Sequence, residues 1–199
     1  MAGFRVIGGT LKGTPLASPK GLAVRPTAAR VREAMANILQ HRIPGAGVLD
    51  LFAGTGALGI EALSRGACSA VFIDNHPAAL AVIQKNITRC GLEAATRTIL
   101  SNPVRSLKCL AGTDKPFDLV FMDPPYGKKV VSATLTRLYT DNVLAPDALV
   151  VVETGAPKGA TGDSRPHPFG EGELPGCFSL STSRKYGKTL VHVIQYVVK

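Results

Sequence analysis

The sequence predicts one α/β domain with a mostly parallel sheet, a carboxyl-terminal antiparallel hairpin and a small basic amino-terminal extension. Strand-like apolar runs alternate with segments of helical periodicity between residues 47 and 153, which is typical of strand–helix–strand units. The length of 199 residues, with 45% hydrophobic residues, suits a single domain with a sizeable core. Two more strand-like runs follow a segment rich in Gly and Pro.

The elements can be placed in order from their hydrophobic patterns. Short apolar runs predict strands, and apolar residues every three or four positions predict helices. The predicted strands are Val48–Phe52, Ala70–Asp74, Thr96–Leu100, Phe117–Asp123 and Leu149–Glu153, with helices Ala57–Ser64, Pro77–Arg89, Val104–Leu110 and Val130–Tyr139 between them. Phe178–Ser183 and Leu190–Val198 predict the hairpin, which turns at Tyr186-Gly187-Lys188. The stretch 155–176 predicts a long surface loop.

Residues 1–45 predict a basic arm and helix that belong to the main domain, 46–199, rather than fold independently. Seven basic residues and one acid give this part a charge of +6, out of +9 for the chain. The basic residues are Arg5, Lys12, Lys20, Arg25, Arg30, Arg32 and Arg42. Such clustering favours a polyanionic partner, nucleic acid first; a soluble basic face is the alternative.

Two details of this extension can be predicted. Arg5-Val6-Ile7 could form a short strand, and Pro26-Thr27 marks a helix start with Thr27 as the cap. The apolar residues of that helix recur at helical spacing, and Arg25, Arg30 and Arg32 fall outside their stripe. We therefore expect these three arginines to lie on an exposed surface.

Composition excludes several classes of protein. No run approaches the 18 apolar residues of a membrane span, and the first residues lack the apolar core of a secretory signal. The four cysteines are widely spaced without a CxxC pair, so neither disulfides nor a metal site is expected. These features predict a protein of the reducing cytoplasm.

A glycine-rich turn joins the first predicted strand to the first helix. Its sequence is Asp50-Leu51-Phe52-Ala53-Gly54-Thr55-Gly56-Ala57-Leu58-Gly59. The glycines spell the G-x-G-x-x-G pattern of dinucleotide sites, which alone is a weak signal. A carboxylate at Asp50 would repel the phosphates of a dinucleotide and attract a cationic amine. The acid therefore favours S-adenosylmethionine, which carries an ammonium and a sulfonium but no phosphate.

Two polar positions follow the next strands. Asp74 ends the second strand, where an acid can accept hydrogen bonds from ribose hydroxyls, although an Asp close before Pro77 could equally serve the start of a helix. Asn102 follows the third strand, where it could contact an adenine edge or form an ordinary turn with Pro103.

The tetrapeptide Asp123-Pro124-Pro125-Tyr126 ends the fourth strand. The prolines have no N–H for the sheet and stop the strand. A carboxylate, a carbonyl and an aromatic ring are thus held together, and they suit a planar base that bears an amine. Asp123 and the Pro124 carbonyl can accept the two amine N–H bonds and stabilise charge that develops on nitrogen. Tyr126 can stack on the base. A base that is buried in paired or stacked nucleic acid must first be swung out.

These motifs resemble the S-adenosylmethionine-dependent amino-group methyltransferases of Rossmann-like fold, and most closely the bacterial 16S rRNA guanine-N2 methyltransferases of the RsmD type. The tetrapeptide is shared with many amino-group methylases. The field is narrowed by Arg5-Val6-Ile7-Gly8-Gly9 with Lys12-Gly13, by Arg25-Pro26-Thr27 with Arg30-Val31-Arg32-Glu33, and by Leu49 to Gly66 around the glycine turn. The resemblance covers about residues 4–154. Ser101-Asn102-Pro103 departs from the family's usual Asp/Asn-Ala pair.

The resemblance implies methyl transfer to the N2 amine of a guanine, guanine 966 in the family's substrate, within a partly or fully assembled small ribosomal subunit. Contacts with the cofactor are implied for Asp50, Phe52, Ala53, Gly54, Thr55, Gly56, Asp74, Asn75 and Asn102. Contacts with the target amine are implied for Asp123, Pro124, Pro125 and Tyr126, and contacts with RNA for Arg5, Lys12, Arg25, Arg30 and Arg32.

Three other functions fit parts of the sequence. Adenine-N6 methylation of DNA needs the same amine chemistry, but 199 residues leave little room for a separate DNA-reading domain. An NAD(P)-dependent oxidoreductase would explain the glycine pattern, and Asp50 argues against it. A non-enzymatic RNA chaperone would explain the basic arm alone.

Overall fold

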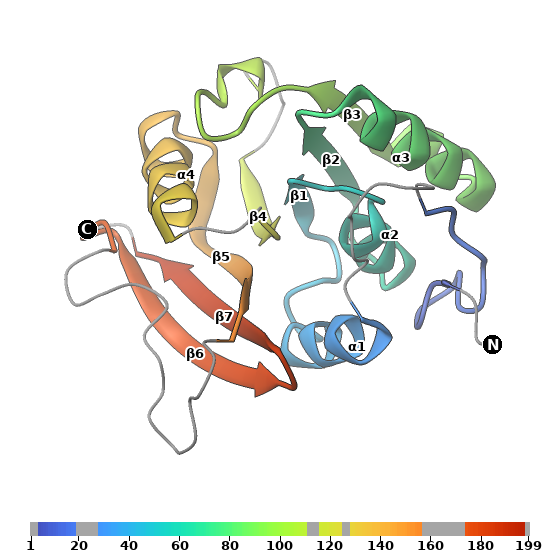
Figure 1. The fold of residues 1–199 in the computed structure, drawn as a ribbon, viewed down its shortest axis with the longest axis horizontal. Coiled ribbons are helices and arrows are strands. Elements are labelled where there is room, and N and C mark those ends of the chain that lie inside the picture. Colours follow the sequence, from blue (N-terminus) through green and yellow to red (C-terminus); the bar gives the residue numbers. More distant parts are fainter. Residues whose placement is uncertain (1–3, 19–27, 111–115, 125–127, 157–173, 198–199) are drawn as a thin grey trace.

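A single seven-stranded sheet organises the computed structural model, which describes residues 4–18, 28–110, 116–124, 128–156 and 174–197 (Figure 1). The strands are β1 Gly47–Leu51, β2 Ser69–Asp74, β3 Thr96–Leu100, β4 Phe117–Met122, β5 Leu144–Gly155, β6 Phe178–Tyr186 and β7 Thr189–Tyr196. Their order across the sheet is β3-β2-β1-β4-β5-β7-β6. Neighbouring strands from β3 to β5 are parallel, and β7 runs antiparallel to both β5 and β6.

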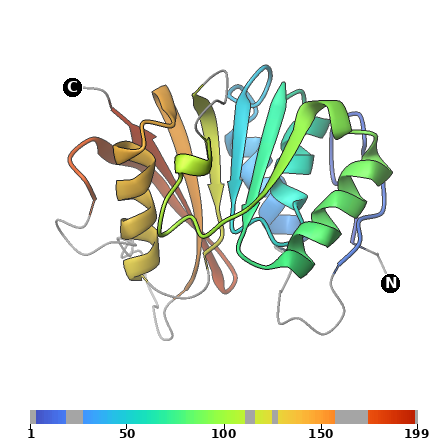
Figure 2. The same cartoon turned by 90° about the horizontal axis from the view of Figure 1, so that it is seen from above.

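Helices cover both faces of the sheet (Figures 1 and 2). The α-helices are α1 Ala29–Ile38, α2 Ala57–Ser64, α3 Pro77–Cys90 and α4 Lys128–Thr140, and two short 3-10 turns are η1 Glu93–Ala95 and η2 Lys108–Leu110. Side chains of α1, α2 and α3 share one hydrophobic core, and those of α4 and η2 belong to the core on the opposite side. We call the first side of the sheet the α2 face.

The alternation of side chains along β1 explains the two cores. Val48 packs in the core of the α2 face, whereas Leu49 and Leu51 pack on the α4 side. The period of two residues therefore turns Asp50 toward the α2 face. In register, Asp50 pairs with Phe72 of β2 and Phe121 of β4. A carboxylate thus lies in a row between two buried aromatic residues.

The predicted fold class is confirmed, including the carboxyl-terminal hairpin that turns at Gly187. The segment Val104–Leu110 was expected to be a helix, and this prediction is wrong: only the turn η2 forms there. The reason is that side chains take its amides, since Asn102 Oδ1 accepts from the Val104 N–H and Asp141 Oδ2 from the Leu107 N–H.

Other boundaries differ at the ends of elements. Strand β5 is longer than the predicted Leu149–Glu153, because its first residues continue the pairing with β4 across a register shift. Residues 5–7 form no strand beyond an isolated bridge between Arg5 and Pro15. The N-cap of α1 is Ala28, not the predicted Thr27. Most of the predicted loop 155–176 lies outside the described residues.

Within the described ranges, no helix has the length and apolar content that a bilayer crossing requires.

Gly59 allows α2 to lie close against the sheet. A Cβ at this position would overlap the ring of Phe72, which is fully buried, and would lie 3.3 Å from Asp50 Oδ2. The close approach also lets the Gly59 N–H donate to Asp50 Oδ2 at 3.0 Å. The third glycine of the G-x-G-x-x-G pattern is therefore required for packing of α2 on β1 and β2.

We expect Gly59→Ala to destabilise the protein by about 1–3 kcal/mol, because the added methyl group overpacks the core. The sign is informative, since Ala otherwise favours a helix over Gly by about 1 kcal/mol. Denaturant unfolding measures the change. Gly176→Ala is the control, because nothing lies within 4 Å of its Cβ position, and its effect should stay within about 0.5 kcal/mol. A Gly59→Ala protein as stable as the control would contradict the packing argument.

Candidate active site

Two acids lie at the carboxyl edge of the sheet, at the ends of the two strands that flank β1. Asp74 is the last residue of β2, and Asp123 follows the last residue of β4. Leu51 pairs with Ile73 of β2 and with Met122 of β4, so the next residues, Asp74 and Asp123, continue one row on either side of β1. Adjacent strands lie about 4.8 Å apart, which places these two backbone positions about 10 Å from each other. By the alternation of side chains both acids point to the α2 face, as Asp50 does. The parallel sheet therefore gathers three carboxylates at one edge.

Asp50 is an acid strongly perturbed by its burial. It is only 2% exposed, and burial raises the pKa of its carboxyl to about 8; the negative charges of Asp123 and Asp74 also raise this pKa, and the Gly59 hydrogen bond lowers it. Buried carboxylates at a shared site are often functional. The site favours a cation, which would stabilise the ionised form of Asp50.

The glycine turn is held in one shape by its own backbone. Phe52 has a φ of 58°, an unfavourable left-handed conformation for a bulky residue. The Ala53 N–H donates to the Ile73 carbonyl, and the Gly56 N–H donates to the Ala53 carbonyl at 2.7 Å. Gly56 also has a positive φ of 73° and begins α2 as its N-cap. The predicted turn is therefore present and rigidly tied to β2.

Asp74 fastens the glycine turn to the end of β2. One carboxylate oxygen accepts the Gly54 N–H at 2.9 Å and the other accepts the His76 N–H at 2.9 Å. The side chain is 5% exposed. Each oxygen retains a further acceptor position, so these bonds leave capacity for a ligand hydroxyl. The N-cap of α3 is His76 and not Asp74, so Asp74 forms a turn before the helix instead of capping it, and its ribose contact stays a prediction.

The two asparagines implied for the cofactor lie at the same edge. Asn75 is exposed between β2 and α3. Asn102 is partly exposed after β3, and its Oδ1 accepts the Val104 N–H at 3.0 Å. This is the ordinary turn that the sequence left open as an alternative. The contact of Asn102 with adenine stays a prediction.

Asp123 and Pro124 are both partly exposed where β4 ends. The strand stops at Met122, in agreement with the effect of the prolines. The remaining two residues of the tetrapeptide, Pro125 and Tyr126, lie outside the described residues, so their roles stay predictions. Asp123 is nevertheless close enough to Asp50 for its charge to affect the Asp50 pKa. The end of β4 and the buried acid of β1 are thus neighbours.

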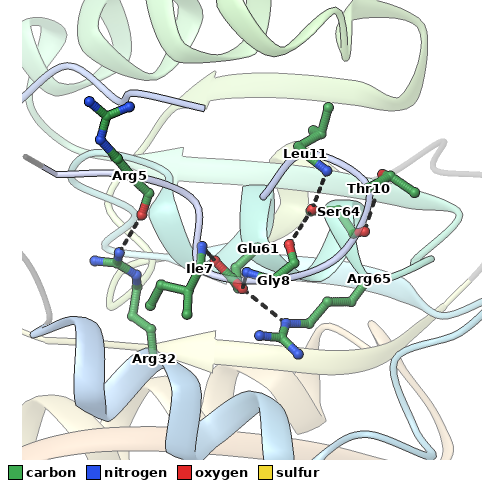
Figure 3. A network of polar contacts seen from close by, with 9 residues as sticks. All are labelled: Arg5, Ile7, Gly8, Thr10, Leu11, Arg32, Glu61, Ser64 and Arg65. Atoms are coloured by element: carbon green, nitrogen blue, oxygen red, sulfur yellow. Dashed lines mark hydrogen bonds and ion pairs between the residues drawn. The ribbon is translucent and has the colours of Figure 1, made fainter. Parts of the chain in front are cut away.

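The amino-terminal arm, residues 4–18, is attached to α2 by two polar side chains (Figure 3). Glu61 accepts the N–H groups of Ile7 and Gly8, each at 2.8 Å, and forms an ion pair with Arg65 at 2.9 Å. Ser64 Oγ donates to the Gly8 carbonyl at 2.6 Å and accepts the Leu11 N–H at 2.9 Å. Glu61 and Ser64 are buried, so the arm is part of the domain's packing.

Arg32 does not lie on the expected RNA-binding surface. Its side chain is 2% exposed, its guanidinium lies 4.8 Å from the Phe4 ring centre, and its Nη2 donates to the Arg5 carbonyl at 2.7 Å (Figure 3). Burial lowers the pKa of Arg32, and Glu61 raises it. The prediction is corrected: Arg32 fixes the arm on α1, since its long stem follows the buried side of that helix.

The other basic residues differ from Arg32. Arg5, Lys12 and Arg30 are exposed, and the Arg5 side chain donates to the Gly13 carbonyl within the arm. Arg25 lies outside the described residues. The exposed cations are therefore available to a polyanion, and their contacts with RNA stay predictions.

Sequence reasoning assigned no role to Asn86, which joins the arm to the glycine turn. This fully buried side chain of α3 accepts the Ala17 N–H at 2.6 Å and donates to the carbonyls of Ala17 and Thr55. A signal was present: Asn86 occupies the apolar stripe of α3, with Ala79, Ile83 and Cys90. Glu61 carried a similar signal, because it is the one charged residue of α2, a helix that is apolar apart from Glu61 and Ser64.

The acceptor groups of the candidate site determine which kind of ligand it can bind. Acceptor oxygens at the ends of β1, β2 and β4 favour a ligand that bears positive charge and several hydrogen-bond donors. Among the described residues, no three or more His, Cys, Asp or Glu side chains form a group that could hold a metal ion.

Comparison with known proteins gives a consistent result. The family model described as Conserved hypothetical protein 95 matches residues 4–195. The ribosomal RNA small subunit methyltransferase D of Escherichia coli K12 is 37% identical over 156 residues, which cover 78% of this chain and 77% of that protein. The protein of the same name from Haemophilus influenzae is 31% identical over 150 residues, 75% of this chain and 78% of that one.

The fold agrees with these relatives. The solved structure of hypothetical protein TTHA0928 from Thermus thermophilus superposes with a TM-score of 0.74 at 28% identity, and covers 98% of this chain and 99% of that one. TrmN of Thermus thermophilus, at 23% identity and a TM-score of 0.66, covers 88% of this chain and 51% of its own, and shares the fold. The chain therefore belongs to the Conserved hypothetical protein 95 family, that of the RsmD-type ribosomal RNA small subunit methyltransferases.

Proposed function

We propose that this protein transfers a methyl group from S-adenosylmethionine to the N2 amine of a guanine in 16S ribosomal RNA. The observation that carries the proposal is the gathering of Asp50, Asp74 and Asp123 on one face of one sheet edge, around a rigid glycine turn. A nucleoside with two positive charges fits this set of acceptors. The relatives named ribosomal RNA small subunit methyltransferase D support the RNA substrate.

The cofactor end of the site is formed by the glycine turn and the ends of β1 to β3. The turn from Phe52 to Gly56 would hold the methionine portion, Asp74 with Asn75 the ribose, and Asn102 the adenine. When bound, S-adenosylmethionine supplies a methyl group made electrophilic by a sulfonium. The chain contributes the orientation of this group through a turn that is already fixed, and the electrostatic environment through Asp50.

The amine end is formed by the tetrapeptide after β4. The N2 lone pair of guanine is delocalised into the ring, so positive charge must be stabilised on nitrogen as it becomes nucleophilic. The Asp123 carboxylate and the Pro124 carbonyl would accept the two N–H bonds and place negative charge where that positive charge develops. Tyr126 would stack on the base, and Pro125 would hold the turn. The proton lost from N2 leaves by way of Asp123 or solvent.

Residues 1–45 would form an RNA-binding extension that does not fold alone. Support comes from the shared core, to which Val6 and Leu16 of the arm and Met35 of α1 contribute. Arg5, Lys12, Arg25 and Arg30 would contact phosphates.

The test of the proposed function is methylation of small ribosomal subunits, and of their free RNA, from cells that lack this protein. Labelled S-adenosylmethionine should mark a single guanine, and mass spectrometry of nuclease fragments should place the methyl group on N2 and identify the nucleotide. Duplex DNA with adenine targets is the competing substrate. Preferential labelling of adenine in DNA would overturn the proposal in favour of adenine-N6 methylation of DNA.

We expect Asp123→Ala to lower kcat for methyl transfer by at least about 100-fold, the usual effect of removing one oriented group from a transition state. Binding of RNA should change little, which filter binding can measure. Asp118→Asn is the control on the same strand, because Asp118 lies at the opposite end and holds the Gly47 N–H. Transfer at the wild-type rate by Asp123→Ala would show that the amine site lies elsewhere.

Cofactor affinity should rise with pH between about 5.5 and 7, by at most about tenfold per pH unit. Asp50 is protonated below its pKa of about 8, and a bound cation would favour the carboxylate, so cofactor binding should release a proton. Calorimetry in buffers of different ionisation enthalpy measures that proton. Asp50→Asn should show no such release.

The same shift has a consequence for stability with the opposite direction. The folded protein keeps a proton on Asp50 that the unfolded chain has lost above its ordinary pKa of 3.8, so the free energy of unfolding of wild-type protein should fall as pH rises from about 6 to 8. The Asp50→Asn variant should lack this slope. An equal slope in both proteins would contradict the raised pKa.

Arg30 and Arg32 should separate RNA binding from folding. Arg30→Gln should weaken binding to a 16S rRNA fragment and reduce the slope of log K against log salt by about 0.7–0.9, the contribution of one phosphate contact. Arg32→Gln should leave that slope unchanged and lower the free energy of unfolding by about 1–3 kcal/mol, since buried acceptors lose a donor. Equal effects of both variants on the slope would contradict the assignment of Arg32 to the interior.

A further inference from the structure

A groove opens between α1 and the β6–β7 hairpin, away from the candidate active site. It is lined by Ala34, Asn37 and Ile38 of α1 and by Arg184 and Tyr186 of β6. The tip of the hairpin lies beside α1 (Figure 1). The volume of the groove is about 410 Å³, within the range of pockets that hold small ligands, about 300–1,000 Å³. None of its residues has a role in the mechanism described above.

The register of the sheet places this groove on the same edge and face as the target amine. Met122 pairs with Val152, so Asp123 continues in the row of Glu153. Glu153 pairs with Val191, and Val191 pairs with Arg184. Asp123 and Arg184 therefore lie three strand spacings apart, about 14 Å. A strand of a few nucleotides can bridge that separation.

The chemistry of the groove matches an unpaired nucleotide. Tyr186 is partly buried against the core of the α2 face and also lines the groove, where its ring offers a surface for a base. Asn37 is exposed and offers an amide for a base edge. Arg184 is exposed and supplies positive charge for a phosphate.

Helix α1 extends the positive charge of the groove toward the active site. Arg30 lies one turn before Ala34 and seven residues before Asn37, on the same side of the helix. Beyond the other end of α1, Arg42 donates to the Asp147 carbonyl, near the start of β5. The amino end of α1, with Arg30, is therefore directed toward the carboxyl edge of the sheet. Among the described residues this end has neither an acid in its first turn nor a side-chain cap, so none of them offsets its positive dipole.

We propose that this groove binds an unpaired nucleotide of the ribosomal RNA strand that flanks the target guanine. Tyr186 stacks on its base, Asn37 contacts the base edge, and Arg184 and Arg30 contact the adjacent phosphates. The groove thereby holds the strand on the hairpin side while the guanine enters the site at Asp123. This inference rests on the proposed function, because it deepens the same RNA substrate.

The test compares kinetics of methyl transfer to small ribosomal subunits that lack the mark. Arg184→Gln should raise KM for the subunit about fivefold and reduce the salt slope by about 0.7–0.9. Tyr186→Leu should raise KM about tenfold. Tyr186→Phe keeps the ring and should have the wild-type KM. In all three, kcat at saturating subunit and the affinity for S-adenosylmethionine should stay at wild-type values. Arg97→Gln is the control, because Arg97 is an exposed arginine of β3, at the opposite end of the sheet.

A photo-crosslinking residue at Asn37 locates the occupant directly and does not depend on the stability of the Tyr186 variants. The expected crosslink falls on RNA within a few nucleotides of the methylated guanine. A crosslink to a ribosomal protein, or KM values and salt slopes equal to those of Arg97→Gln, would overturn the nucleotide site while wild-type methylation of RNA continued. If wild-type protein methylated no RNA at all, the proposed function would fail and this inference with it.

Discussion

The convergence of three carboxylates at the end of a parallel sheet is the constraint on which the rest of the site depends. Parallel strands end at one edge, and equal side-chain parity turns Asp50, Asp74 and Asp123 to one face. Like charges at such distances in a partly buried place disfavour ionisation of one another. The protein meets this cost by leaving the most buried acid, Asp50, protonated near neutral pH. A ligand that brings an ammonium and a sulfonium would offset this cost, so affinity for a cation follows from the topology.

The glycine turn and the arm are connected through buried polar side chains. The arm forms no strand of the main sheet, so its amides need other acceptors. Glu61 and Ser64 supply these from α2, and Asn86 supplies them from α3 while it also bonds to Thr55 in the glycine turn. The cofactor turn and the basic arm therefore share a support. A movement of the arm on binding RNA would be transmitted to Thr55 through the Asn86 side chain.

Periodicity and motif order were enough to predict the parts of the protein that depend on backbone chemistry. The glycine turn, the strand stopped by Pro124 and the hairpin at Gly187 all follow from residues with restricted or extended conformational freedom. Arg32 was misplaced because charge was read as exposure, whereas its long apolar stem packs beneath the arm and its head finds Phe4 and a carbonyl. The helix expected after Asn102 failed because Asp141, distant in sequence, takes one of its amides. Long-range side-chain bonds of this kind leave no local pattern.

The distribution of charge around the edge would also orient the proposed RNA substrate. The interior of the candidate site is acidic, while its flanks carry Arg30 on α1 and Arg184 on β6. A phosphate is repelled by the carboxylates and attracted by both flanking cations. A neutral base with an exocyclic amine would meet the reverse conditions, because the proposed acceptors at Asp123 and Pro124 would match its N–H donors. In the proposed complex the same field would keep the RNA backbone outside and draw a base inward, and it would favour bases that carry an exocyclic amine over uracil, which has none.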